Sequence, residues 1–197
     1  MEFRVVRDVR VMLPSDELDE SAGEGDELRG VRVVGAQWQR AEWDRRAVGG
    51  VVFERVDLSS ARWSGVKVER TRFTGCKLSG LAWSDGSLGN VLFEDCRLDY
   101  ASFRQVDVVG PVTFVNCTLT EASVVGGRWR TVAVESCRLE GMEFDGCDLR
   151  GADLRGNLLS GVRGVESLRG VTVAAEQVDQ LAAALVADLG ITVDGRY

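Results

Sequence analysis

The sequence predicts an all-β solenoid, a rod of stacked coils, on three observations. Large apolar residues recur at every fifth position from Val33 to Val108 and, after one extra residue, from Phe114 to Leu159. The position two residues before each of them is mostly small and apolar. Four cysteines follow one another at intervals of 20, 21 and 20 residues. A period of five matches neither a helix nor a strand, so the chain must turn a corner within every five residues.

The five-residue unit resembles that of the pentapeptide-repeat family. The family's unit is written A(D/N)LXX, and the stretch Ala152-Asp153-Leu154-Arg155-Gly156 matches it. The resemblance covers residues 31 to 160. It implies a right-handed quadrilateral β-helix with four units in each coil and about 6.5 coils in all. Stacking such coils at a strand spacing of roughly 4.8 Å buries the apolar pair of every unit in one continuous column.

A coil of twenty residues places equivalent positions above one another on one of four faces. The phenylalanine face is defined by Phe53, Phe73, Phe93 and Phe114. The leucine face is defined by Leu58, Leu78, Leu98, Leu119 and Leu139. The tryptophan face is defined by Trp43, Trp63, Trp83, Phe103 and Phe144. All of these side chains are expected to point into the core rather than to form a stacking platform for bases.

The same coil length makes a ladder of the cysteines. Cys76, Cys96, Cys117 and Cys137 fall on one inward position of successive coils, where free thiols pack as small apolar side chains. Their spacing lacks the close pairs of a zinc site, so no metal is expected. The total of five cysteines is odd and no secretory signal precedes them, which favours reduced thiols.

One irregularity interrupts the period. The extra residue lies near 109–113, within Val109-Gly110-Pro111-Val112. It falls at a corner, where glycine relaxes the backbone and proline removes a hydrogen-bond donor. The sequence therefore predicts a bulge there, or a functional kink along the rod.

Both ends of a solenoid must be covered, because bare edges polymerise. Residues 1–30 are expected to be an acidic N-terminal cap. Residues 161–197 form a C-terminal cap with an amphipathic helix over about 174–188, whose apolar stripe is Val178, Leu181, Leu185 and Leu189. This helix either caps the last coil or joins two rods tail to tail. The segment resembles the C-terminal segment of the gyrase-binding members of the family, which implies a homodimer through this stripe.

Outward side chains of the phenylalanine face form the predicted partner-binding surface. Carboxylates project from alternate coils of this face, with one more acid and two apolar residues beside them. The predicted surface consists of Glu54, Glu94, Asp95, Glu135, Val52 and Leu92. A solvated surface of mixed charge, without function, is the alternative interpretation.

The composition argues against catalysis. The chain has no histidine, and it contains neither a P-loop motif nor a dinucleotide-binding motif after a strand. A filled solenoid core leaves no cleft for a substrate, so we expect no enzyme, no catalytic residue and no cofactor. Charged residues interrupt the N-terminal apolar stretch, which predicts neither a signal peptide nor a membrane span. A cytoplasmic protein is therefore expected.

Two binding functions remain. The net charge of the chain is -7. Residues 1–30 contribute -5, whereas the acids and bases of residues 31–160 cancel to a net charge of zero. The resemblance implies a DNA mimic that binds a type II topoisomerase such as DNA gyrase and protects it from drugs or toxins, which requires a dimer long enough to imitate a duplex. The alternative is a structural scaffold with an unrelated protein partner. Direct nucleic-acid binding is not expected, because the chain is acidic overall.

Overall fold

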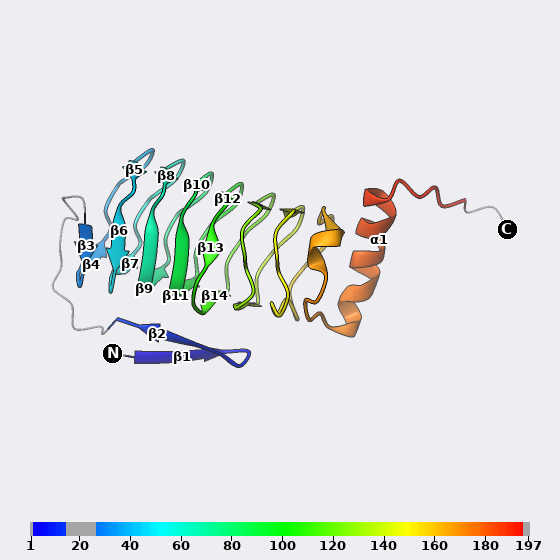
Figure 1. Ribbon diagram of the computed structural model, residues 1–197, viewed down its shortest axis with the longest axis horizontal. Coiled ribbons are helices and arrows are strands. Elements are labelled where there is room, and N and C mark those ends of the chain that lie inside the picture. Colours follow the sequence, from blue (N-terminus) through cyan, green and yellow to red (C-terminus); the bar gives the residue numbers. More distant parts are fainter. Residues whose placement is uncertain (1, 15–26, 195–197) are drawn as a thin grey trace.

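The computed structural model describes residues 2–14 and 27–194 of the chain. The predicted all-β solenoid with one C-terminal helix is confirmed, with about six coils stacked along one axis (Figure 1). The solenoid begins at Glu27–Arg29, a few residues before the expected start at residue 31. The acidic run of the predicted N-terminal segment, residues 15–26, lies outside the described residues.

The phenylalanine face and the face before it in each coil form one parallel sheet. Its main path runs through β3 (Glu27–Arg29), β6 (Ala47–Gly49), β9 (Lys67–Thr74), β11 (Ser87–Glu94), β14 (Val112–Val115) and β16 (Val132–Glu135). Beside this path lie β4 (Arg32–Val34), β7 (Val52–Glu54) and β13 (Asp107–Val108). β9 and β11 run unbroken around the corner between the two faces, whereas the coils of β3 and β4, of β6 and β7, and of β13 and β14 use two short strands there.

The tryptophan face is a second parallel sheet on the other side of the core. It consists of β5 (Glu42–Asp44), β8 (Arg62–Ser64), β10 (Ala82–Ser84), β12 (Ser102–Arg104), β15 (Ser123–Val125) and β17 (Glu143–Asp145). The leucine face has no regular strand, but single bridges join its rungs from Gln37 to Leu158. Corners are turned by residues in the left-handed region, such as Arg55 (φ 51°) and Asp95 (φ 54°).

Aromatic rings form the column that holds the coils in register. The ring centroids of Phe53 and Phe73 are 4.7 Å apart, and those of Phe73 and Phe93 are 4.8 Å apart. On the tryptophan face, Trp43 and Trp63 stack at 4.6 Å with an interplanar angle of 5°. In-register parallel strands bring identical side chains to the strand spacing, so each ring buries both of its faces on its neighbours.

The cysteine ladder lies inside this core, as predicted. Cys76, Cys96, Cys117 and Cys137 are free and buried, and the backbone N–H of Cys117 donates to Cys137 Sγ at 3.2 Å. Asn157 occupies the next rung of the ladder, where its Oδ1 accepts the N–H of Cys137 at 2.8 Å. Among the described residues, no group of three or more metal-ligating side chains is placed to hold an ion.

The residues before the solenoid form an antiparallel hairpin. β1 (Glu2–Val6) and β2 (Val9–Leu13) are joined by Arg7 and Asp8, both with positive φ, as a two-residue hairpin turn of type I′ requires. β2 packs on β9, β11 and β14, and β1 reaches β16. The hairpin therefore lies along the side of the rod, across the coils of the phenylalanine face, whereas a cap would lie over the first coil (Figure 1).

The C-terminal end of the rod is covered by helices. The 3₁₀ turns η1 (Val165–Leu168) and η2 (Ala175–Gln177) precede α1 (Val178–Asp188), and Gly190 follows with a φ of 61°. Gln177 Nε2 donates to the carbonyl oxygens of Leu154 and Asn157, each at 2.8 Å. These bonds satisfy backbone groups that the last coil would otherwise leave open. No helix within the described ranges is long and apolar enough to cross a membrane.

Candidate protein-interaction surfaces

The predicted acidic row lies on the phenylalanine face, where two of its three glutamates are ion-paired. Glu54 accepts hydrogen bonds from Arg32 Nη2 at 2.7 and 2.8 Å. Glu94 pairs with Arg4, which comes from β1 of the hairpin. Glu135 is half-buried and forms no ion pair within the described part of the chain. These pairs reduce the negative charge that a partner would meet along this row.

The predicted apolar patch beside the row is not on the surface of the folded chain. Val52 is 1% exposed and Leu92 is fully buried. Leu92 packs in a cluster with Val11 and Leu13 of β2, so the hairpin is the reason for its burial. Asp95 lies at the neighbouring corner and accepts a hydrogen bond from Asn116 Nδ2. The hairpin that covers Leu92 lies outside the repeat, so the five-residue period gave no sign of it.

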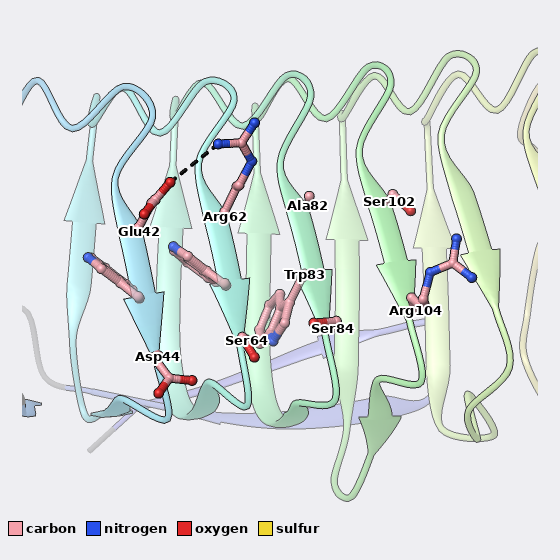
Figure 2. Close-up of a pocket in the computed structure, with 11 residues that line it drawn as sticks. Glu42, Asp44, Arg62, Ser64, Ala82, Trp83, Ser84, Ser102 and Arg104 are labelled. Carbon is pink, nitrogen blue, oxygen red and sulfur yellow. Dashed lines mark hydrogen bonds and ion pairs between the residues drawn. The ribbon is translucent and has the colours of Figure 1, made fainter.

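The tryptophan face is one of the open faces of the rod. A hollow of about 640 Å³ runs along it over β5, β8, β10 and β12 (Figure 2). It is lined by short outward side chains, among them Ala82, Ser84 and Ser102, and by Trp43, Trp63 and Trp83 beneath them. The hollow exists because these outward positions carry no long side chain, which leaves the sheet itself accessible between the charged residues at both ends. Four strands at roughly 4.8 Å spacing span about 14 Å, a length of four extended residues.

The charged side chains around the hollow come from three of its four strands. Glu42 and Asp44 project from β5, and Arg62 from β8 pairs with Glu42 at 3.3 Å (Figure 2). Arg104 projects from β12 at the other end. The side chains of Glu42 and Arg62 are each more than 70% exposed, so their pair is weak and can exchange for contacts with a partner. The hollow thus offers carboxylates at one end and a guanidinium at the other.

The C-terminal helix has one face against the solenoid and one towards solvent. Ala184 is buried and Leu181 packs against the core of the rod. Val178, Leu185 and Leu189 are 53%, 45% and 64% exposed. The predicted dimerisation stripe therefore divides: Leu181 belongs to the cap, and the other three side chains form an exposed apolar surface. Beyond the helix, Ile191 and Val193 are 49% and 73% exposed and extend the apolar character of this end.

Two sequence signals could have indicated the open hollow and the hairpin, which the period missed. The outward positions of the tryptophan face change from charged to small along the chain, from Arg62 to Ala82 and Ser102. The stretch EFRVVRDVRVML alternates apolar and polar residues around Arg7 and Asp8, which is typical of a hairpin. Neither signal states where on the rod its segment lies.

Comparisons with known proteins agree with this architecture. A family model described as "Pentapeptide repeat region" matches residues 48–124, and a model of "Pentapeptide repeats (8 copies)" matches residues 135–163. No curated protein matches the chain in sequence.

Solved structures show a distant likeness of fold. The trypsin-treated form of QnrB1, a plasmid-mediated fluoroquinolone resistance protein, is 20% identical, with 85% of this chain and 99% of that chain covered and a TM-score of 0.30. HetL from Nostoc sp. strain PCC 7120 is 18% identical over 75% and 83% of the chains, with a TM-score of 0.33. Rfr23 from Cyanothece 51142 is 17% identical over 73% and 88%, with a TM-score of 0.34. At these identities the likeness concerns the fold alone.

Proposed function

Because the chain belongs to the pentapeptide-repeat family, we propose that it is a non-enzymatic rod that binds another protein along its tryptophan face. The observation that carries this proposal is the contrast between two faces of one solenoid. The phenylalanine face is covered by the hairpin β1–β2, whereas the tryptophan face is open and hollowed over β5, β8, β10 and β12. A rigid, repeated surface of this kind is what solenoid proteins use to bind partners.

Catalysis is not part of the proposal, because the side chains and the cavity do not support it. The chain has no histidine to serve as a general base near neutral pH. The interior is filled by stacked rings such as Phe73 and Phe93, so the hollow is a surface feature and not a closed site. The free cysteines are all buried and suit a reducing compartment, and we place the protein in the cytoplasm.

The chemistry of the open face describes the partner. A protein segment that presents a basic side chain toward Glu42 and Asp44, small or extended backbone over Ala82, and an acidic side chain toward Arg104 complements the hollow. Such a segment lies along the rod axis and crosses the rungs of β5, β8, β10 and β12.

Pairing of two rods through α1 is the second part of the proposal. Val178, Leu185 and Leu189 remain exposed although the helix is already seated on the last coil. An apolar surface at the end of a rod is a common mark of a protein contact, and a two-fold axis there would let the same residues face each other. Two rods joined in this way present two tryptophan faces to a partner.

Mimicry of DNA toward a type II topoisomerase such as DNA gyrase is a narrower form of the same function. The rod shape favours it, whereas residues 31–160 of the rod carry no net charge. A phosphate-like row requires unpaired carboxylates, however, and Glu54 and Glu94 are paired with arginines. A scaffold with an unrelated protein partner requires no such row, so we rank the scaffold first.

A photo-crosslinking amino acid at position 82 tests the open face in cells. We expect a discrete crosslinked partner at Ala82 and none when the same group replaces Ser160, which is exposed on the leucine face. Identical products at both positions, or none at position 82, would contradict the assignment of the binding face.

Two further measurements separate the remaining parts of the proposal. Replacing Leu185 and Leu189 with Asp should convert a dimer to a monomer by sedimentation, without loss of the fold, because both side chains are exposed. An unchanged mass excludes this helix as the dimer contact. The DNA-mimic hypothesis is tested in a gyrase supercoiling assay with and without a fluoroquinolone. If micromolar protein neither inhibits gyrase nor protects it from the drug, the mimic is excluded and the scaffold remains.

A further inference from the structure

The hairpin β1–β2 covers the phenylalanine face, whose strands are already paired with those of the neighbouring coils. Beneath β2 and β1 lie outward side chains of β11, β14 and β16, namely Leu92, Thr113 and Ala133, all 0% exposed. Two outward residues at comparable heights on other faces, Lys77 and Ala82, remain in solvent. Their burial is therefore caused by the hairpin and not by the coil.

The contact between hairpin and rod is small and separate from the core. Val11, Leu13 and Leu92 form their own cluster, and the stacked rings of the rod lie in another. A two-stranded hairpin is marginally stable on its own. It is held here by that cluster, by the ion pair of Arg4 with Glu94, and by a hydrogen bond of 3.3 Å from Met12 N–H to Asn90 Oδ1. Such a satellite cluster can open without disturbing the aromatic column.

One polar group opposes closure of the hairpin. The Thr113 hydroxyl is buried beneath it and finds no hydrogen-bond partner among residues 2–14 and 27–194. A buried hydroxyl without a hydrogen-bond partner destabilises the closed arrangement. Release of the hairpin returns Thr113 to solvent and leaves Glu94 without Arg4, so the open face presents an apolar row beside an unpaired carboxylate.

We propose that the phenylalanine face is a second docking site, occupied in cis by the hairpin, and that an extended partner segment of the same chemistry displaces it. That segment carries aliphatic side chains at alternate positions, as Val11 and Leu13 are placed, and an arginine for Glu94. The carboxylates Glu94 and Glu135 then face the partner, while Glu54 stays paired with Arg32 of β4 on the surface of the rod. This site is independent of the tryptophan face.

The test uses the full-length protein and a fluorescent peptide with the sequence of residues 2–14 as the probe. Val11→Asp removes the buried anchor of the hairpin, and Val5→Asp places the same charge on its outer side, where Val5 is 63% exposed. We expect the V11D protein to bind the peptide at least ten-fold more tightly than wild type or V5D. Trypsin should also cleave V11D faster at Arg4, Arg7 and Arg10. Adding Glu94→Arg to V11D should abolish peptide binding.

Each other outcome overturns the proposal. Faster trypsin cleavage of V11D without peptide binding shows that the exposed face is not a docking site. Equal peptide binding by wild type and V11D shows that the hairpin does not control access. Peptide binding that survives Glu94→Arg shows that the arginine contact is not used. A V11D-dependent change in sedimentation mass assigns the face to the hairpin of a second copy. If V11D loses the near-ultraviolet signal of the stacked rings, Arg4→Glu replaces it, with the same expected direction.

Discussion

The rings of Phe93 and Phe114 stack at a centroid distance of 4.8 Å with an interplanar angle of 5°, although 21 residues separate them where 20 separate Phe73 from Phe93. The extra residue is taken up between Val108 and Val112, which pair with Leu88 and Val91 on the coil below. Val109 is pushed outward there and is 68% exposed. The predicted bulge therefore preserves the register of the core on both sides of it.

Phe93→Ala should destabilise the rod strongly, because Phe93 is 1% exposed and stacks on rings both above and below. Truncation of a fully buried phenylalanine costs about 3–5 kcal/mol. Urea denaturation followed by near-ultraviolet circular dichroism measures the change. A loss below about 1 kcal/mol would show that the stacked column is not a principal source of stability.

Deletion of Val109 should leave the fold intact, because it restores a coil of twenty residues without moving any inward side chain. Deletion of the exposed corner residue Asn116 is the matched control, since it shifts Cys117 and Leu119 out of their inward positions. We expect the Val109 deletion to unfold cooperatively at a urea midpoint near that of the wild type. The Asn116 deletion should show no cooperative unfolding transition. Equal effects of the two deletions would contradict the assignment of the bulge.

Gly86→Ala should be destabilising, because its Cβ would lie 2.1 Å from Trp83 Nε1 and 2.4 Å from the carbonyl oxygen of Val66. Those two atoms form a buried hydrogen bond of 3.2 Å, which the methyl group would break. We expect a loss of about 2 kcal/mol or more, as for other overpacked core sites. Gly49→Ala is the control, because its nearest contact is at 4.0 Å. Tryptophan fluorescence and thermal unfolding of both variants provide the measurement.

Asp148→Asn should lower stability at pH 7, and by a smaller amount at pH 2. Hydrogen bonds from Arg150 and Arg130 hold the pKa of Asp148 well below its usual range. A carboxylate with a depressed folded-state pKa stabilises the fold above its unfolded pKa of about 4 and loses that contribution as pH falls through the lower folded value. The gap between variant and wild-type urea midpoints should therefore narrow on acidification. The matched control is Asp145→Asn, at an exposed acid that forms no ion pair within residues 2–14 and 27–194. A gap that stays constant for Asp148→Asn would argue against the Arg–Asp contacts.

The repeat, the inward rows, the cysteine ladder and the bulge could all be predicted from the sequence, because each unit of five residues encodes its own corner and its own inward pair. The position of Phe53 in the core follows from residues within one coil of it. The C-terminal helix followed from its local period as well. The contacts of the helix residues could not be predicted in this way. Leu181 packs against the core of the rod, whereas Leu185 faces solvent.

The surfaces depended on contacts between residues far apart in the chain. Leu92 is outward by period, yet it is buried because Val11, some eighty positions earlier, packs on it. Arg4 likewise removes the charge of Glu94 across ninety positions. The five-residue period repeats the same local information in every coil. It does not indicate where a segment outside the repeat, such as the hairpin, packs on the rod. The sequence by itself therefore determines the rod. Which of its faces is covered depends on where the hairpin packs, because burial depends on residues that are neighbours in space and not in the chain.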